Sequence, residues 1–169
     1  MYPQAISNYE HSLKLFEQIK DIRLIRNVLH NLGVLYCSQD NYPKAYSTLE
    51  KKLKIEVSNK WEKEQAITLN DIGIVLMELG EYSRALDYSQ KSLKMREQMG
   101  DENGIGASNI NIGNIYNMIH DYPKALEYYQ KALKISEHLN DKELISYSLG
   151  NIGQIYNSLR EREVRLKFA

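Results

Sequence analysis

The chain has 169 residues, of which 43% are hydrophobic and 26% charged, as is typical of a folded globular protein. Basic and acidic residues both total 22, so no overall charge favours nucleic acid or an anionic membrane as a partner. The single cysteine, Cys37, cannot form an internal disulfide, which favours a reducing compartment. The opening MYPQAISNYE lacks a signal-peptide pattern, and no apolar run could span a bilayer. We therefore expect a cytoplasmic protein without a membrane segment.

The sequence repeats itself with a period of 40 residues. The columns with the same residue in every copy are Tyr2, Tyr42, Tyr82 and Tyr122; Ala5, Ala45, Ala85 and Ala125; Leu13, Leu53, Leu93 and Leu133; Lys14, Lys54, Lys94 and Lys134; and Gly33, Gly73, Gly113 and Gly153. A period of this size is typical of solenoids, in which each unit buries its apolar face only against its neighbours.

Each repeat contains two helical patterns. In chain order, the apolar spacing predicts helices near 3–19, 22–38, 42–58, 61–79, 82–98, 103–119, 122–138 and 142–166. The turn HDYP shows how one of them starts, because Asp121 can cap the helix and Pro123 fits its first turn. The last helix should continue into the tail, since no glycine or proline follows Gly153.

The glycine column lies in the middle of predicted helices, where glycine is about 1 kcal/mol less favourable than alanine. We expect these glycines to let a neighbouring helix pack directly onto the backbone, with the alanine column in the same role on the partner helix. A catalytic role for them is not expected.

These repeats resemble the tetratricopeptide repeat. The matching residues are Leu32, Gly33, Tyr36 and Ala45; Ile72, Gly73 and Ala85; Ile112, Gly113, Tyr116, Ala125 and Ala132; and Ile152, Gly153 and Tyr156. The period of 40 is longer than the usual ~34 residues, as in the long-repeat branch of kinesin light chains, Leu-Gly-Asn polarity adaptors and bacterial signalling regulators. Leu76 replaces the expected tyrosine.

The resemblance implies an all-α fold, a right-handed α-solenoid of antiparallel helix pairs with a concave groove that binds proteins or extended peptides. We expect one array over residues 1–169, with an orphan second helix in 1–20 and full repeats in 21–60, 61–100 and 101–140. Residues 141–169 should form a final first helix with a helical tail.

The groove should be lined by one stripe of the first helix of each repeat, opposite the apolar stripe of Leu29, Leu32 and Tyr36. Amides suit this role, because each carries donors and an acceptor for a peptide backbone. The expected groove residues are Asn31, Asn70, Asp71, Asn111, Asn114, Asn117, Asn151, Gln154 and Asn157. The alternative is that these side chains bond neighbouring helices or only face solvent.

Other functions find less support. A clamp for a C-terminal carboxylate needs basic groove residues, and the columns of His30 and of Asn27 contain none. The lysine column reads as a solvated outer face rather than a nucleic-acid ridge, because Glu10 precedes Lys14 and Glu50 precedes Lys54 at ion-pair spacing.

No constellation indicates chemistry. His30 and Cys37 are only two ligands, too few for a zinc site, and GDENGIG lacks the lysine of a phosphate-binding loop. Without a nucleophile–base arrangement we expect no enzyme, no metal and no cofactor.

Two alternative functions stay open: a regulatory fragment of a larger protein, and a self-assembly element. The first segment reads as a second helix and the last as a first helix, so the two ends are complementary in kind. That complementarity favours an end-to-end homo-oligomer.

Overall fold

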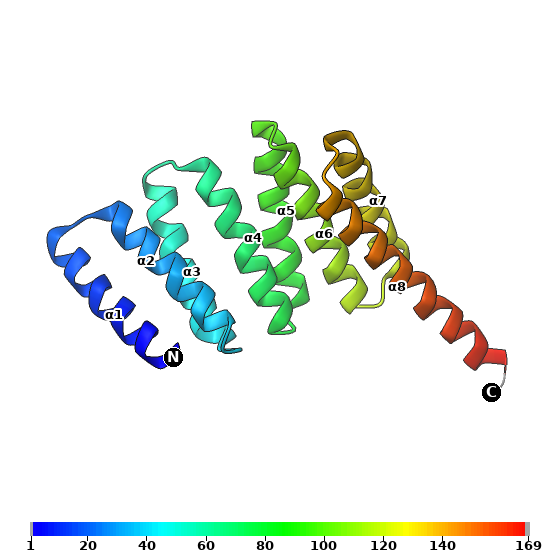
Figure 1. Cartoon of the computed structure of the whole chain (residues 1–169), viewed down its shortest axis with the longest axis horizontal. Coiled ribbons are helices and arrows are strands. Elements are labelled where there is room, and N and C mark those ends of the chain that lie inside the picture. The colour runs from blue at the N-terminus through cyan, green and yellow to red at the C-terminus, as the bar shows by residue number, and fades with distance from the viewer. Residues whose placement is uncertain (1, 168–169) are drawn as a thin grey trace. The chain divides into compact units, whose positions relative to one another are not determined.

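The computed structural model describes the backbone of residues 2–167, with the side chains of residues 2–161 and 163. These residues form eight helices and no strand (Figure 1). The helices are α1 (Tyr2–Ile19), α2 (Ile22–Cys37), α3 (Tyr42–Ser58), α4 (Glu62–Glu78), α5 (Tyr82–Met99), α6 (Glu102–Met118), α7 (Tyr122–Leu139) and α8 (Lys142–Lys167). The prediction of an all-α helical repeat is confirmed, and each expected helix end lies within one residue of the observed one.

The helices group into two compact units, one up to Ser92 and one from Leu93 onward, so that the division falls within α5. In the first unit, α1 packs on α2, α2 on α3 and α3 on α4. In the second, α7 packs on both α6 and α8. Within each unit the core therefore lies between helices that follow one another in the chain. The expectation of a single array over residues 1–169 stays a prediction.

Left-handed backbone marks the turn between helices at intervals of 20 residues. The residues with positive φ, between 54° and 74°, are Lys20, Asp40, Lys60, Gly80, Gly100, His120 and Asn140. At each turn the next amide bonds back to a carbonyl five residues earlier, as Asp121 does to Tyr116 at 2.9 Å. This is the pattern of a helix that ends in a left-handed cap.

The next helix then often starts on a side-chain cap, although α4, which follows Trp61, has none. Asp121 Oδ1 accepts from the amide of Lys124 at 3.3 Å, as predicted, and Pro123 lies in the first turn of α7. Asn41 and Pro43 repeat this arrangement in α3. A left-handed end followed directly by a capped start reverses the chain within a few residues, which makes successive helices antiparallel neighbours.

The glycine column does mark close contacts, but mainly with side chains rather than with backbone. A Cβ added at Gly113 would lie 2.6 Å from Cε1 of Tyr129, and one at Gly33 would lie 3.0 Å from Cδ2 of Leu49. Each partner follows its glycine by sixteen residues. The expectation that a neighbouring helix packs onto the glycine backbone is confirmed at these positions, and the contact is made by a side chain of that helix.

Gly73 is the one copy that also approaches backbone. An added Cβ would overlap the Ser89 hydroxyl and lie 3.3 Å from the carbonyl oxygen of Ala85. At Gly153, by contrast, no atom lies within 4 Å of an added Cβ. The packing role of the column therefore holds for three of its four members.

Replacing Gly113 by leucine should destabilise the second unit, because the new side chain would occupy the volume of the Tyr129 ring. Overpacking of this kind costs about 1–3 kcal/mol. Urea unfolding followed by circular dichroism would measure the loss. Gly150→Leu is the matched control, since Gly150 also lies in a helix but has open space around it. Equal unfolding midpoints for the two variants would refute the close-contact interpretation.

Candidate functional site

The predicted groove residues lie on the first helices α2, α4, α6 and α8, on the side away from the buried stripe of Leu29, Leu32 and Tyr36. Half-buried side chains are those of Asn31, Asp71, Asn111, Asn114, Asn117 and Asn151. Gln154 and Asn157 are exposed. Judged within its own unit, each of eight of the nine predicted residues is thus at least partly accessible to a binding partner.

Asn70 is the exception, because its side chain is only 7% exposed. It follows Ala66 by four residues and precedes Gly73 by three, and both of these are buried. Residues at those spacings share a helix face, so Asn70 belongs to the edge of the core stripe. Its side chain is therefore not part of an accessible surface.

Asn114 and Asn157 make hydrogen bonds within the fold. The Tyr129 hydroxyl donates to Asn114 Oδ1 at 2.8 Å, which ties α7 to α6. Asn157 Nδ2 donates to Glu161 Oε1 at 3.2 Å within α8. For these two residues the alternative interpretation, that the amides bond within the fold, has direct support.

In the first unit an apolar cleft opens between α2 and α4, with α3 at its floor. It measures about 260 Å³ and is lined by His30, Gly33, Val34 and Cys37 of α2, Ser38 at its end, Leu49 of α3, and Asp71, Ile74 and Val75 of α4. Val34 is 52% exposed there, so an aliphatic side chain of this cleft is accessible to a partner. The apolar cleft combines an accessible hydrophobic surface with the predicted residue Asp71.

A charged cleft of about 390 Å³ adjoins the apolar cleft, because His30 lines both. Its other lining residues are Arg26, Lys52, Glu56, Lys63, Glu64 and Ile67. A third cleft of about 280 Å³ continues past Arg26 and Glu64 to Arg23, Asn27 and Trp61. Together the three clefts form a furrow along α2 and α4, which we call the α2–α4 furrow.

Buried charges lie at the centre of the furrow. Lys52 and Glu56 are both buried, and Lys52 Nζ lies 3.9 Å from Glu56 Oε1 and 3.3 Å from His30 Nδ1. Arg26 lies 3.9 Å from the same carboxylate oxygen. Burial lowers the pKa of Lys52 and of His30 and raises the pKa of Glu56. Each shift opposes charge, so desolvation outweighs the mutual attraction of the cluster.

The charged cluster was not found from the repeat pattern. Its positions read Ser12, Lys52, Ser92 and Ala132 in one column, and Phe16, Glu56, Arg96 and Ser136 in the other. The available signal was a charge in a column that otherwise holds small or apolar residues: Lys52 alone in the first column, and Glu56 and Arg96 in the second. Arg26 and the buried Lys52 thus bring basic groups to the furrow from columns other than those of His30 and Asn27. The lysine column is exposed, as expected.

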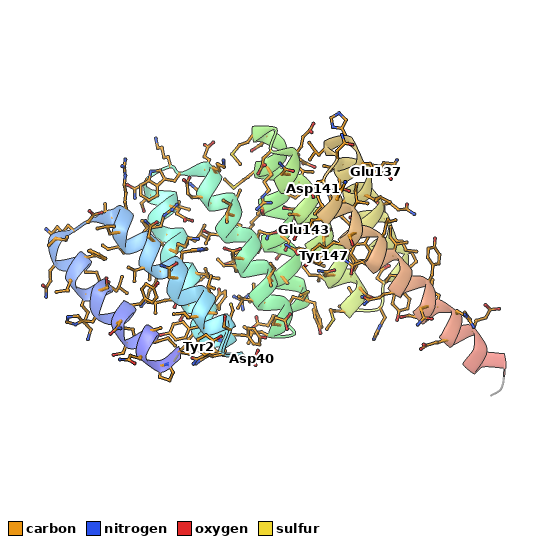
Figure 2. The ribbon with its side chains drawn as sticks, in the orientation of Figure 1. Tyr2, Asp40, Glu137, Asp141, Glu143 and Tyr147 are labelled. Carbon is orange, nitrogen blue, oxygen red and sulfur yellow. The ribbon has the colours of Figure 1, made fainter. Side chains whose placement is uncertain are left out.

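In the second unit, α8 carries an open cleft of about 600 Å³. It is lined by Glu143, Ser146, Tyr147, Gly150, Asn151 and Gln154. Figure 2 shows Glu143 and Tyr147 along the same stretch of α8. The cleft brings together two of the predicted residues, Asn151 and Gln154, beside an exposed aromatic ring.

Among the residues that the structure describes, no group of three His, Cys, Asp or Glu side chains could hold a metal ion. In the same part of the chain, every helix is too short or too polar to cross a membrane.

Replacing Tyr129 by phenylalanine tests the link between α7 and α6. Loss of the bond to Asn114 should lower the free energy of unfolding by about 0.5–1.5 kcal/mol at pH 7. Burial raises the pKa of Tyr129 to about 12, above the usual value of 10.0. The folded state therefore favours the neutral phenol, and this stability is present below pH 10 and lost as the pH rises toward 12.

Urea unfolding at pH 7 to 11 would show a shallower alkaline loss of stability for Tyr129→Phe than for the wild type. Tyr2→Phe serves as the control, because Tyr2 is half exposed on α1. The Asn114→Ala change should cost little in the Tyr129→Phe background, since the bond is already lost. Additive effects of the two changes would contradict the proposed link.

Solved structures of several known proteins share this fold. Solved structures that resemble it include BtubC (BKLC) from P. vanneervenii, with 23% identity and a TM-score of 0.82 over 94% of this chain and 66% of that one. The apo form of RapI matches with 21% identity and a TM-score of 0.83 over 99% of this chain and 46% of that one.

A third similar structure is a Rap protein complexed with competence and sporulation factor, at 15% identity and a TM-score of 0.77. The alignment covers 96% of this chain and 49% of that one. This chain thus spans about two-thirds of BtubC and about half of the Rap proteins. At these identities the likeness shows the fold alone.

No curated protein matches this sequence. The family model of the tetratricopeptide repeat, however, matches three overlapping stretches, at residues 24–98, 64–138 and 104–163. These matches cover most of the chain and follow its period of 40 residues. The chain therefore belongs to the tetratricopeptide repeat family.

Proposed function

We propose that this chain is a non-catalytic scaffold that binds an extended peptide segment of a partner protein on the exposed sides of its first helices. The observation that carries the proposal is the α2–α4 furrow, where a partly exposed apolar cleft adjoins a charged one. Concave apolar sites with a few polar groups are typical of ligand binding.

The dimensions of the furrow suit a short extended segment. From Arg23 to Cys37 its lining follows α2 over fourteen residues, or roughly 21 Å at the helical rise. An extended peptide of about six residues has this length. Its apolar side chains would pack on Val34 and Ile74, and its backbone amides and carbonyls would meet polar groups such as Asn27 and Asp71.

The second unit offers a surface of the same kind. Asn111 on α6 and Asn151 on α8 occupy equivalent positions in successive repeats, and both are half-buried. Two amides at a fixed repeat spacing can each hold a peptide group of an extended chain. The Rap structure with its bound factor, which shares this fold, supports a binding role for such repeats.

The composition supports a protein partner over nucleic acid or a membrane. The chain is neutral overall, and Lys124 and Lys131 pair with the nearby acidic residues Asp121 and Glu127. Such ion pairs reduce the positive charge that a phosphate backbone could use at these positions. We also propose that the protein acts in the cytoplasm without a cofactor.

Val34→Glu should weaken peptide binding, because it places a charge in the apolar cleft. Peptides selected against the wild type from a displayed random library, then synthesised with a fluorescent label, are the probes. Loss of one buried aliphatic contact should lower their affinity about tenfold or more in fluorescence anisotropy. Val57→Glu is the matched control, because Val57 is 55% exposed against 52% for Val34 but lies outside the three clefts.

The alkylation rate of Cys37 provides a second readout in the same experiment. It is the only cysteine of the chain and lines the apolar cleft. A peptide bound there should slow alkylation of Cys37 by iodoacetamide, and Val34→Glu should remove that protection. Selected peptides that bind Val34→Glu normally and leave Cys37 reactive would place binding elsewhere and overturn the role of this cleft.

The double change Asn111→Ala and Asn151→Ala tests the second unit. Each lost hydrogen bond costs about 0.5–1.5 kcal/mol, so affinity for peptides selected separately against the Val34→Glu variant, whose furrow is blocked, should fall roughly tenfold while the melting temperature stays nearly unchanged. Gln130→Ala, an exposed amide on α7, is the control. A large fall in melting temperature at unchanged affinity would make the two asparagines structural.

A further inference from the structure

His30 stands where the apolar cleft and the charged cleft of the α2–α4 furrow meet, because it lines both of them. We propose that His30 makes peptide binding in the furrow dependent on pH: the neutral imidazole favours the bound peptide, and the protonated imidazole weakens its binding. This control acts on the peptide binding proposed above and rests on it.

The imidazole of His30 contacts a buried ammonium group. Lys52 Nζ of α3 lies 3.3 Å from His30 Nδ1, and the Lys52 side chain is only 4% exposed. A charged ammonium group can only donate hydrogen bonds, so the ring nitrogen has to be the acceptor. A protonated imidazole carries a hydrogen on both ring nitrogens and cannot accept this bond. The contact between α2 and α3 therefore requires the neutral form of His30.

Charged groups face His30 from three helices. The titratable side chains that line the two clefts with it are Arg26 and Cys37 of α2, Lys52 and Glu56 of α3, and Lys63, Glu64 and Asp71 of α4. On α1, which also packs on α2, Glu10 accepts a hydrogen bond from the Tyr36 hydroxyl on the buried stripe. Partial burial lowers the pKa of His30, the charge of Lys52 lowers it further, and Asp71 opposes the shift only in part.

Protonation of His30 would set an imidazolium beside the ammonium group of Lys52. Two positive charges at this distance repel each other, and the hydrogen bond between them is lost. Glu56 Oε1, one turn further along α3, lies 3.9 Å from Lys52 Nζ and offers that ammonium group another partner. Lys52 can thus turn toward Glu56 while the imidazolium turns toward solvent. The wall that the two clefts share would then change shape.

A bound peptide would favour the neutral form of His30. His30 is exposed in the free protein, and a peptide that runs from the apolar cleft to the charged cleft would cover it. Removing water from the imidazole disfavours its charged form, so the pKa of His30 should fall further in the complex. By linkage, protonation of His30 must weaken peptide binding to the same extent.

A single linked proton limits the size of the effect. Affinity can fall by at most about tenfold for each pH unit, because one proton is taken up for each peptide released. The pKa of the free imidazole already lies below its ordinary value of 6.5, so affinity should change little above pH 7. Between pH 7.5 and pH 5.5 we expect a loss of about threefold to tenfold.

The first test follows the imidazole itself by NMR. In labelled protein, the His30 ring signals, assigned by their loss in His30→Asn, should titrate below pH 6.5, and at lower pH still when peptide is bound. Lys52→Met keeps a side chain of similar volume without the charge, and it should move the His30 titration to higher pH. A titration that neither peptide nor Lys52→Met displaces would overturn the proposed control.

The second test measures affinity by fluorescence anisotropy at pH 7.5 and pH 5.5. Peptides selected from a library without His, Asp or Glu, with acetylated and amidated ends, carry no group that titrates in this range. His30→Asn keeps an acceptor near the position of Nδ1 but cannot be protonated, so it should bind like the wild type at pH 7.5 and lose much less affinity at pH 5.5. His11→Asn is the matched control, because His11 is exposed on α1, and it should keep the full pH dependence.

Burial raises the pKa of Glu56, so this carboxyl group can titrate in acid as well. It is present in both proteins, and only the difference between wild type and His30→Asn therefore reports on His30. An equal loss of affinity in both proteins overturns the role of His30, and so does a wild-type affinity that stays constant or rises toward pH 5.5. In each of these cases the peptides still bind at pH 7.5 and still respond to Val34→Glu, which separates failure of the pH control from failure of the binding function.

Discussion

The close contact between a first-helix glycine and the side chain sixteen residues later is the constraint on which each unit depends. The glycine is constant, but its partner is Leu49, Ser89 or Tyr129. A missing Cβ leaves space on one helix, so the other can fill it with side chains of different volume. Because repeat units bury their apolar faces only against their neighbours, this pairing is the main source of the core.

Because one stripe of each first helix packs inward, the opposite stripe stays accessible. The candidate binding surfaces lie on this accessible stripe. The α2–α4 furrow arises because two first helices flank a second helix, so that Leu49 of α3 lies at the floor of the apolar cleft. The same geometry buries Lys52 and Glu56, whose pKa shifts show that desolvation opposes their charge. Charges kept at such a cost are more common at functional sites than in cores.

Much of the local structure could be read from the sequence. The apolar spacing of 3.6 residues located all the helices, and Asp121 with Pro123 located a helix start. The left-handed turns were harder to recognise, because only Gly80 and Gly100 of the seven such residues are glycines. Residues such as Lys60 and His120 adopt this backbone because the helices on both sides hold them there, which propensity alone does not reveal.

By itself, the sequence determined the helices, their order and the stripe that each first helix turns inward, since all three depend on spacing along one chain. The tertiary structure alone decided how much of each side chain stays accessible. Asn70 and His30 occupy the same position in successive repeats, yet Asn70 is buried and His30 is exposed. Periodicity predicts the direction in which a side chain points from its helix axis. Whether that side chain is buried depends on which residues of the neighbouring helices pack against it, as Lys52 and Glu56 also show.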